Sequence, residues 1–361
     1  MSPPDDDPGS HAGTGEDADE TLARAARAGV HRLDIPTPFL VGRVNLYLIR
    51  DEPLTLVDTG PNSGTSLDML EQALAEHGVT IEDIELLVLT HQHMDHVGLL
   101  EIIARRAKAE VAALAPLAPW LAAHPNSAAA DDAYAQTVMR AHGVPQELIT
   151  VLGAVAAAFR AYGSRGEVTR PLREGDLLEL RHRTLQVLHR PGHSPSDTVL
   201  FDEKRGILLA GDHLIAHISS NPLITRPLAA VQAHPADEQP SYASTTRPRP
   251  LIDYIASMRA TSELPLGLVL PGHGDPITDH RALIAERLRL HERRARKILR
   301  IITGAPCSAY EIAEQMWGNV AVTQAFLTLS EVLGHLDILL AEDAAAELEP
   351  GEDGVVRFRS R

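Results

Sequence analysis

The sequence predicts a layered α/β domain followed by a smaller helical appendage. From about residue 30 to residue 280, short apolar runs alternate with segments of helical periodicity, which is typical of sheets flanked by helices. Histidine or aspartate repeatedly stands where a predicted strand ends. The 361 residues are enough for one large domain with an appendage, or for two domains.

The apolar runs are bounded by turn residues and predict nine strands, at residues 30–34, 44–49, 54–58, 86–90, 111–114, 185–188, 198–201, 206–210 and 267–270. Helical spacing predicts helices at residues 65–77, 97–108 and 251–260. Functional sites of α/β sheets gather where strands end. The polar residues that follow strands here are Asp58, His91, His193, Asp212 and His273.

The chain divides into three parts by composition. Residues 1–25 are predicted to be a disordered acidic tail, since residues 1–20 hold seven acids and no Lys or Arg. Residues 26–280 form the α/β domain, interrupted by an Ala-rich helical insertion at residues 116–163 and a Pro-rich insertion at residues 216–250. These insertions are either surface elaborations or walls of a substrate pocket.

Residues 281–361 are predicted to form a linker helix and a winged-helix-like domain, with helices at residues 308–317 and 323–340 and a strand at residues 355–358. Residues 281–300 hold eight basic and two acidic side chains, whereas residues 301–356 hold ten acids and no Lys or Arg. A recognition helix needs cations for phosphates, so nucleic acid is not an expected partner. We expect the appendage to pack against the α/β domain or a second subunit, which leaves a homo-oligomer open.

Charge and cysteine content narrow the class of protein further. The chain has 33 basic and 49 acidic residues and a net charge of −16, which disfavours anionic membranes and nucleic acid. Its single cysteine, Cys307, excludes an internal disulfide and a cysteine metal cluster. The sequence shows neither a secretory signal nor an apolar stretch of 18 residues, so we expect no membrane association and a cytoplasmic location.

The densest chemical signal follows the strand at residues 86–90. His91, His93, Asp95 and His96 lie within six positions. Two residues apart in extended chain, His91 and His93 can point to one side, and Asp95 and His96 reach a neighbouring point at the turn into a helix. This spacing predicts a metal site. Three later candidates each follow a glycine, which lets the backbone approach a crowded centre: His193, Asp212 and His273.

The HxHxDH motif with a later histidine, aspartate and final histidine resembles the metallo-β-lactamase-fold hydrolases over about residues 30–280. The resemblance implies an αββα sandwich and two divalent metal ions, most plausibly Zn²⁺, although the same ligands accept iron or manganese. It also implies a role for each position: His91, His93 and His193 for the first ion, Asp95, His96 and His273 for the second, Asp212 as the bridge, and Asp58 as the buried acid that orients a ligand histidine.

Within this family the pattern favours particular hydrolases. The lactamases proper typically carry Cys or Ser at the position of Asp212, so the aspartate argues against antibiotic hydrolysis. The pattern is closer to glyoxalase-II-like thioesterases, lactonases and lactamase-like proteins with a C-terminal winged helix. Two ions about 3.5 to 4 Å apart would hold a bridging hydroxide as nucleophile, with Asp212 between them and Asp95 able to steer its proton. Leu99 and Ser196 depart from glycines that are common in the family.

Three functions are compatible with these residues. The first is hydrolysis of an ester-type bond in a small molecule, most plausibly a thioester or a lactone. The second is a metal-dependent phosphodiesterase or ribonuclease, which needs a basic channel at the metals. The third is a non-catalytic interaction protein that uses the winged-helix surface. His217 and Tyr242, both in the second insertion, are candidates for the substrate pocket.

Overall fold

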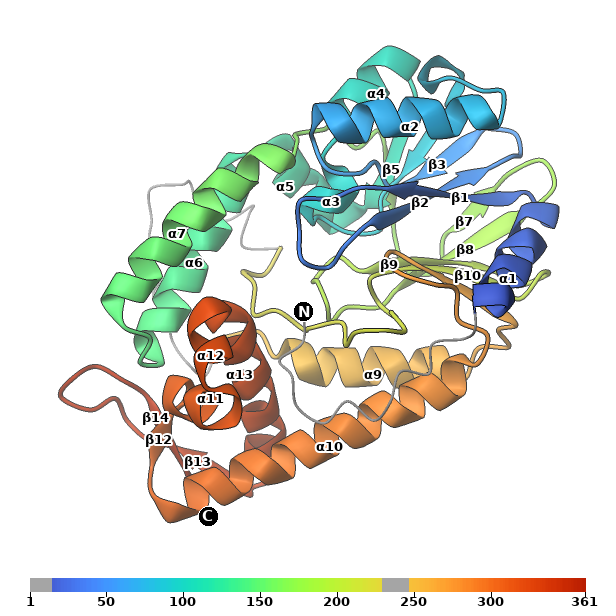
Figure 1. Ribbon diagram of the computed structural model, residues 1–361. Helices are drawn as coiled ribbons and strands as arrows, with labels where there is room; N and C mark the ends of the chain where they lie inside the picture. Colours follow the sequence, from blue (N-terminus) through green and yellow to red (C-terminus); the bar gives the residue numbers. More distant parts are fainter. Residues whose placement is uncertain (1–14, 229–246) are drawn as a thin grey trace.

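The computed structural model describes residues 15–228 and 247–361, and its α/β part consists of two facing sheets with helices on both outer faces (Figure 1). The first sheet runs in the order β1 (Val30–Ile35), β2 (Val44–Ile49), β3 (Thr55–Val57), β4 (Leu86–Val88), β5 (Glu110–Leu114), β6 (Arg170–Leu172). The second runs in the order β11 (Leu268–Pro271), β10 (Ile207–Gly211), β9 (Thr198–Asp202), β8 (Thr184–His189), β7 (Leu177–Glu179).

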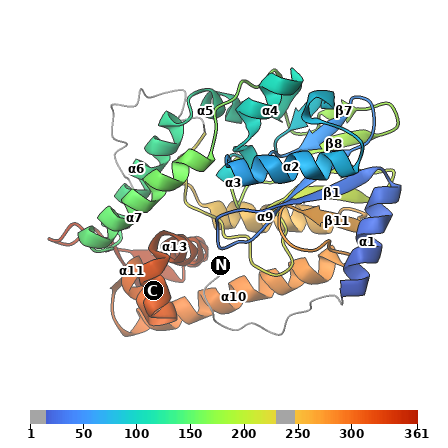
Figure 2. The ribbon, with the colours of Figure 1, turned by 45° about the horizontal axis from the view of Figure 1, so that its top comes forward.

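The alternation of side chains along the strands builds the layers. In the fully buried strand β2, Leu46 and Leu48 join the apolar cluster beneath α2 (Gly64–Glu76) and α4 (Leu100–Ala107). Tyr47 and Ile49 point the other way, into the core between the two sheets. On the far face, strands β8 to β11 pack against α9 (Pro250–Ser262) and α10 (His280–Gly304). The αββα sandwich is therefore confirmed (Figure 2).

Strand direction decides where the polar residues emerge. β3 and β4 are parallel, so their carboxyl ends lie at one edge of the first sheet. In the second sheet β8 and β10 are each antiparallel to β9, and β10 is parallel to β11, so these three strands also end at a common edge. The segments that follow these five strands carry Asp58, His91, His193, Asp212 and His273.

The first insertion is helical, as predicted. It comprises η2 (Ala115–Leu117), α5 (Ala118–Ala122), α6 (Asn126–Ala141), α7 (Gln146–Phe159) and η3 (Arg160–Tyr162). In the second insertion, residues 216–228 and 247–249 contain neither helix nor strand, and the remainder lies outside the described residues. Within the two described ranges, no helix has the length and apolarity to cross a membrane.

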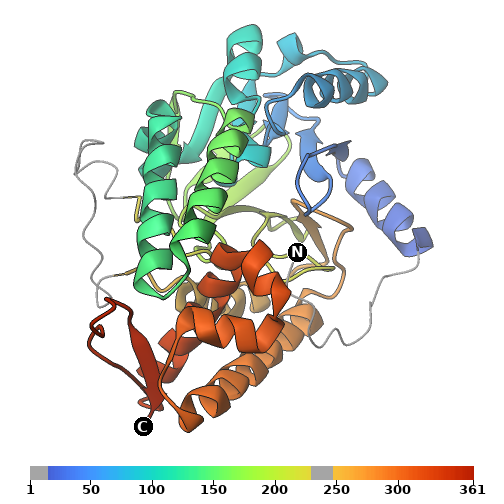
Figure 3. The ribbon, with the colours of Figure 1, turned by 60° about the vertical axis from the view of Figure 1, so that its left-hand side comes forward.

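The C-terminal region has its own core and packs against the first insertion (Figure 3). It contains α11 (Ala309–Trp317), α12 (Asn319–Thr323), α13 (Ala325–Ala341) and a small sheet of β12 (Cys307–Ser308), β14 (Arg357–Ser360) and β13 (Ala345–Glu347). Apolar residues of α6, α7 and the second half of α10 join those of α11 and α13 in one cluster. The expected contact with the α/β domain is present, and the winged-helix assignment stays a prediction.

The prediction of a disordered tail is wrong for residues 15–25. These residues belong to helix α1 (Gly15–Arg27), which packs beside β1, and residues 1–14 of the predicted tail lie outside the described residues. The acidic composition of residues 1–20 concealed the apolar side of this helix, where Ala25 is buried in the core between the sheets. Arg24 also donates a hydrogen bond of 3.2 Å to the carbonyl of Gly267, just before β11.

Two further differences concern short elements. The helix predicted at residues 97–108 is divided into α3 (Met94–Val97) and α4, with the break at Gly98 and Leu99. Strands β6 and β7 were not predicted, because each spans three residues, which is too few for a strand pattern to be recognised.

A buried ion pair ties α13 to the segment before α9 and generates a testable prediction. Arg247 donates to both carboxylate oxygens of Asp337, at 2.6 and 2.5 Å, and both side chains are buried. Asp337→Asn removes the negative charge from a buried arginine, so we expect the free energy of unfolding to fall by about 3 to 5 kcal/mol. Urea denaturation followed by circular dichroism measures it.

Asp343→Asn is the matched control, because Asp343 pairs with Arg361 on the exposed surface. Exposed pairs contribute about 0 to 1 kcal/mol. Equal destabilisation by the two variants would contradict a structural role for the Arg247–Asp337 pair.

Candidate metal centre

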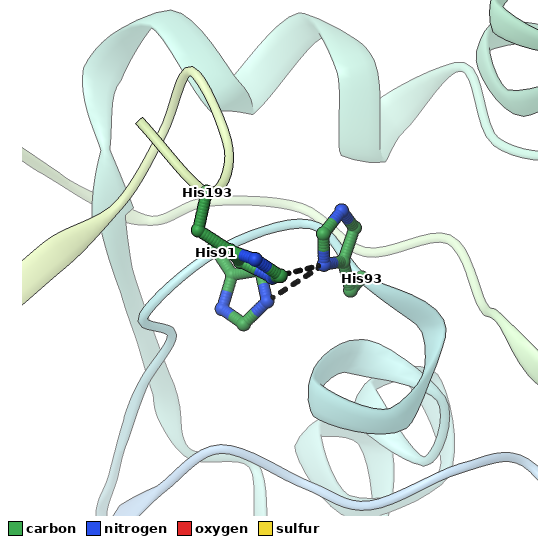
Figure 4. Close-up of side chains that lie close together, drawn as sticks. All are labelled: His91, His93 and His193. Atoms are coloured by element: carbon green, nitrogen blue, oxygen red, sulfur yellow. Dashed lines mark hydrogen bonds between the residues drawn. The ribbon is translucent and has the colours of Figure 1, made fainter. Parts of the chain in front are cut away.

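Three histidines from two loops converge on one point at the edge of the sandwich (Figure 4). His91 and His93 lie in the extended segment after β4, and His193 follows β8. Nδ1 of His93 lies 3.0 Å from Nε2 of His91 and 2.8 Å from Nε2 of His193. Three imidazole nitrogens at these separations can occupy three corners of a tetrahedral metal site.

A second group lies directly beside the first. Asp95 and His96 come from the short helix α3, and His273 follows β11. Nε2 of His273 lies 3.3 Å from an oxygen of Asp95 and 3.4 Å from one of Asp212. Asp212 also lies 3.4 Å from Nε2 of His96 and 3.5 Å from Nε2 of His193. Its carboxylate therefore stands between the two groups.

Asp58 holds the ligand loop from behind. Its carboxylate accepts hydrogen bonds from Nδ1 of His96 at 2.7 Å and from the backbone N–H and the hydroxyl of Thr90, each at 2.8 Å. Because the Thr90 hydroxyl donates to Asp58, its oxygen is free to accept from Nδ1 of His91, 3.0 Å away. Both histidines are thereby fixed with Nε2 directed to the centre. The predicted orienting acid thus contacts one ligand histidine directly and a second through Thr90.

The loop that carries His273 is anchored by groups from β2 and the segment before it. Nδ1 of His273 donates to the carbonyl of Arg43 at 2.7 Å, which directs Nε2 to the centre. The side-chain amide of Asn45 donates to the carbonyls of Pro271 and Gly274. The hydroxyl of Tyr47 also donates to the carbonyl of Pro271, at 2.7 Å. Sequence reasoning did not single out these partners, because their contacts span more than 220 residues.

Glycine is required at the point of closest approach. A Cβ atom on Gly272 would lie 2.2 Å from Oδ1 of Asp212 and 2.9 Å from the His96 ring. Gly211, just before Asp212, has φ +48° and would place a Cβ 2.9 Å from Thr90. The expectation that glycines allow the backbone to approach a crowded centre is confirmed at both positions.

The donor set fits divalent metal ions. Nε2 of His96, Nε2 of His273 and Oδ1 of Asp212 are buried and make no hydrogen bond. Buried polar atoms are almost always paired, so three such atoms facing one point call for a cation. Imidazole nitrogens and carboxylate oxygens are donors that zinc, iron and manganese accept.

The titration behaviour agrees with this interpretation. Burial lowers the pKa of His93 to about 3, assisted by His193, and lowers the pKa of His91 well below its ordinary value. Both rings are therefore neutral at pH 7, as ligands must be. Burial would also lower the pKa of His273, but the carboxylates of Asp212 and Asp95 together outweigh burial and raise that pKa to about 10. The proton on His273 balances the charge of the neighbouring carboxylates, and a bound metal cation would balance that charge in its place.

The two pocket candidates have different outcomes. His217 lies at the exposed rim, where its ring packs so closely over Gly274 that a Cβ there would lie 2.4 Å from Nδ1. It is thus adjacent to the loop of His273, and its role in a pocket stays a prediction. Tyr242 lies outside the described residues. His213, beside Asp212 in sequence, points away and contacts the hydroxyl of Thr261 at 2.9 Å.

Both departures from the family pattern have a physical explanation. Leu99 is fully buried in the apolar cluster beneath α2 and α4. The hydroxyl of Ser196 donates to the side-chain carbonyl of Gln92, which joins the loop of His193 to that of His91 and His93. Asp197 accepts from the backbone and hydroxyl of Ser194, at 2.9 and 2.7 Å, and closes the same loop. Gln92 and Asp197 were not recognised from the sequence.

Several known proteins resemble this chain in sequence or in structure. The family model described as the metallo-beta-lactamase superfamily matches residues 40–273. The chain is 36% identical over 313 residues to a probable metallo-hydrolase, YqjP, of Bacillus subtilis, which covers 86% of this chain and 92% of the relative. It is 29% identical over 186 residues to the acyl-coenzyme A thioesterase MBLAC2 of Bos taurus, which covers 47% of this chain and 58% of that protein. A solved metallo-beta-lactamase family protein of Thermus thermophilus superposes with a TM-score of 0.72 at 26% identity, covering 92% of this chain and 99% of the other.

The arrangement around Asp58 predicts its effect on metal binding. Asp58→Ala removes the acceptor that fixes His96 and, through Thr90, His91. We expect the affinity for a divalent metal to fall by about 10- to 100-fold. Competition with a chelator of known affinity measures it.

Asp51→Ala is the control for the loss of a buried carboxylate. Asp51 binds the backbone of His182 and the side chain of Arg183, and neither residue belongs to the metal-ligand groups. This variant should lower stability and leave metal affinity unchanged. An equal loss of affinity in both variants would refute the orienting role of Asp58.

Proposed function

The chain belongs to the metallo-β-lactamase superfamily of metallohydrolases, and we propose that within it the protein is a dinuclear metal-dependent hydrolase that cleaves a thioester. The observation that carries the proposal is the position of Asp212. Its carboxylate lies within 3.4 to 3.5 Å of three histidines that belong to two adjacent ligand groups. A carboxylate shared between two groups is the arrangement that two-metal hydrolases use.

Each ligand group has three residues besides the shared carboxylate. His91, His93 and His193 would hold one ion, and Asp95, His96 and His273 the other. When bound, two divalent ions supply Lewis acidity for the scissile carbonyl and an activated water as nucleophile. The bound metal is proposed to be zinc, because most of the donors are imidazole nitrogens.

The remaining polar groups have roles in positioning and proton transfer. Asp58 and the Arg43 carbonyl each fix one ring so that a nitrogen faces the centre. The Asp95 carboxylate, 3.3 Å from Nε2 of His273, can accept a proton from an attacking water and return it to a leaving thiolate. No Ser, Cys or Lys nucleophile is required.

Two observations support a thioester over the other ester-type bonds. One relative, 29% identical to this chain over 186 residues, is an acyl-coenzyme A thioesterase by name. A thiolate is also a good leaving group, so its expulsion does not demand a strong general acid. A lactone is the closest alternative with the same chemistry at the metals.

Phosphodiester hydrolysis is less favoured because it needs cations beside the metals. The basic side chains of α10, Arg293, Arg296, Lys297 and Arg300, line a groove of about 440 Å³ with Met316 and Trp317. None of these residues belongs to the ligand groups. A panel of acyl-coenzyme A thioesters, lactones, phosphodiesters and single-stranded RNA, assayed on protein of measured metal content, tests the substrate class.

The first prediction from this proposal is a metal stoichiometry. Since two groups of three ligands share one carboxylate, we expect two divalent ions per chain after reconstitution with zinc. Elemental analysis of protein freed from excess metal measures the ratio. A ratio that stays at one or below would rule out the dinuclear site.

The second prediction separates chemistry from folding. Asp212→Ala should lower kcat/KM for the best thioester by more than about 100-fold, with little change in thermal stability. This loss is larger than the loss typical of residues that hydrogen-bond to metal ligands. His213→Gln is the control from the adjacent position, because His213 contacts Thr261 and not the centre. If both variants lost activity equally, local packing would explain the effect and the bridging role would be refuted.

A further inference from the structure

An exposed apolar stripe runs along helix α7. From Thr150 to Phe159 the helix carries no charged side chain. Val151, Val155 and Phe159 are spaced four residues apart, which places them on one side of the helix, and they are 59%, 44% and 38% exposed. Leu40, in the loop between β1 and β2, is 78% exposed. We call these four residues the α7 stripe, and exposed apolar side chains gathered along one side of a helix are typical of a binding site.

The upper end of the stripe is connected to the metal centre through the β1–β2 loop. The ring of Phe39, next to Leu40, packs edge-on against Phe159 at a centroid distance of 5.5 Å. The same loop ends at Arg43, whose carbonyl accepts the hydrogen bond from the ligand His273. One short loop thus contacts both α7 and a ligand of the metal centre.

A second connection passes through η3, which follows α7 directly. Phe39 also packs against Tyr162, with a centroid distance of 5.6 Å. The carbonyl of Tyr162 accepts from the backbone of Asn62 at 2.8 Å and would lie 2.3 Å from a Cβ on Gly98. Gly98 ends α3, the helix that carries Asp95 and His96. Figures 1 and 2 both show α7 extending from the C-terminal helices toward α3.

We propose that the α7 stripe binds the apolar acyl chain of the thioester substrate, so that the enzyme prefers long-chain acyl thioesters. This inference rests on the proposed function. From Val151 to Phe159 the helix rises by about 12 Å. Its Phe159 end packs against the loop that ends at Arg43, next to His273, and the proposal is that an acyl chain whose thioester carbonyl is at the metal centre lies along this helix. Each methylene that the stripe removes from water should improve binding by about fourfold.

Two other occupants are less compatible with these observations. A stable contact between two copies of the chain needs about 800 Å² from each partner, which is large for one side of a helix and one loop residue. An anionic membrane is disfavoured by the net charge of −16. An acyl chain needs only the stripe itself and its continuity with the metal centre.

Chain-length dependence tests the proposal. Val155→Asp places a charge in the middle of the stripe. For the metal-loaded enzyme we expect kcat/KM for dodecanoyl-coenzyme A to fall at least tenfold more than kcat/KM for acetyl-coenzyme A, chiefly through KM. Val155→Leu, which keeps the surface apolar, should retain the preference for the longer chain.

Leu177→Asp is the matched control. Leu177 is 52% exposed on β7, the edge strand of the second sheet and the one farthest in strand order from β11. This variant should leave the ratio of the two activities unchanged. Equal effects of Val155→Asp on the two thioesters would overturn the stripe as an acyl site and leave the thioesterase proposal standing.

Binding of dodecanoate to the full-length protein, measured by isothermal titration calorimetry, separates the stripe from the proposed reaction. Weaker binding of dodecanoate to Val155→Asp than to Leu177→Asp supports the stripe as an acyl site, whether or not a thioester is hydrolysed. Absence of thioester hydrolysis would refute the proposed function and not the stripe. The protein could instead self-associate and become monomeric in Val155→Asp, with no change in dodecanoate affinity or chain-length preference. That result would show that a second copy of the chain occupies the stripe, and it would overturn the proposal.

Discussion

The candidate metal centre depends on the hydrogen bonds that the Asp58 carboxylate accepts. Asp58 lies at the end of β3 with φ +62°, a conformation that non-glycine residues rarely adopt, and it reaches across to the loop after β4. From there it fixes His96 directly and His91 through Thr90. The strained backbone is compensated by three hydrogen bonds to one buried carboxylate, and two ligand rings are oriented as a result.

Sheet topology explains why ligands from distant parts of the sequence can meet. The second sheet contributes His193, Asp212 and His273 from strands that end at a common edge, and the first sheet contributes the loop after β4. The core between the two sheets is apolar, and hydrogen bonds from Asn45 and Tyr47 of β2 to the loop after β11 join the sheets at the edge that carries the site, so core packing and these bonds together set the relative position of the two edges.

The sequence predicted those features that local pattern determines. Strand β2 is matched residue for residue, since five of its six positions are apolar or aromatic. All seven ligand candidates are brought together, because motif spacing and the preceding glycines are visible locally. The Arg43 carbonyl, Asn45 and Tyr47 could not be found this way, because a backbone acceptor or a hydrogen bond across more than 220 residues leaves no local signal. Helix α1 was missed because composition was given more weight than periodicity.

A second cluster of metal-binding residue types shows why residue identity is insufficient. His291, Glu331 and His335 lie together and buried between α10 and α13. Glu331 already pairs with Arg294 at 2.6 Å, and His335 donates from Nδ1 to the Glu331 carbonyl. Because a protein cation balances this carboxylate, the cluster is explained as a polar joint between two helices. At the candidate metal centre, in contrast, no Lys or Arg among the described residues pairs with Asp212, and its carboxylate faces Nε2 of His96, His193 and His273 at 3.4 to 3.5 Å.

The C-terminal region has a role in positioning α7, the helix that is proposed to bind the acyl chain. Ile149 of α7 is buried in the C-terminal core, where Leu148 and Leu152 also pack, while Val151 and Val155 of the same helix are exposed. One helix therefore has a side fixed by the C-terminal region and another available to a ligand. The polar joint and the Arg247–Asp337 pair hold α13 in place, and α13 in turn supports α6. The C-terminal region accordingly determines where the α7 stripe lies relative to the metal centre.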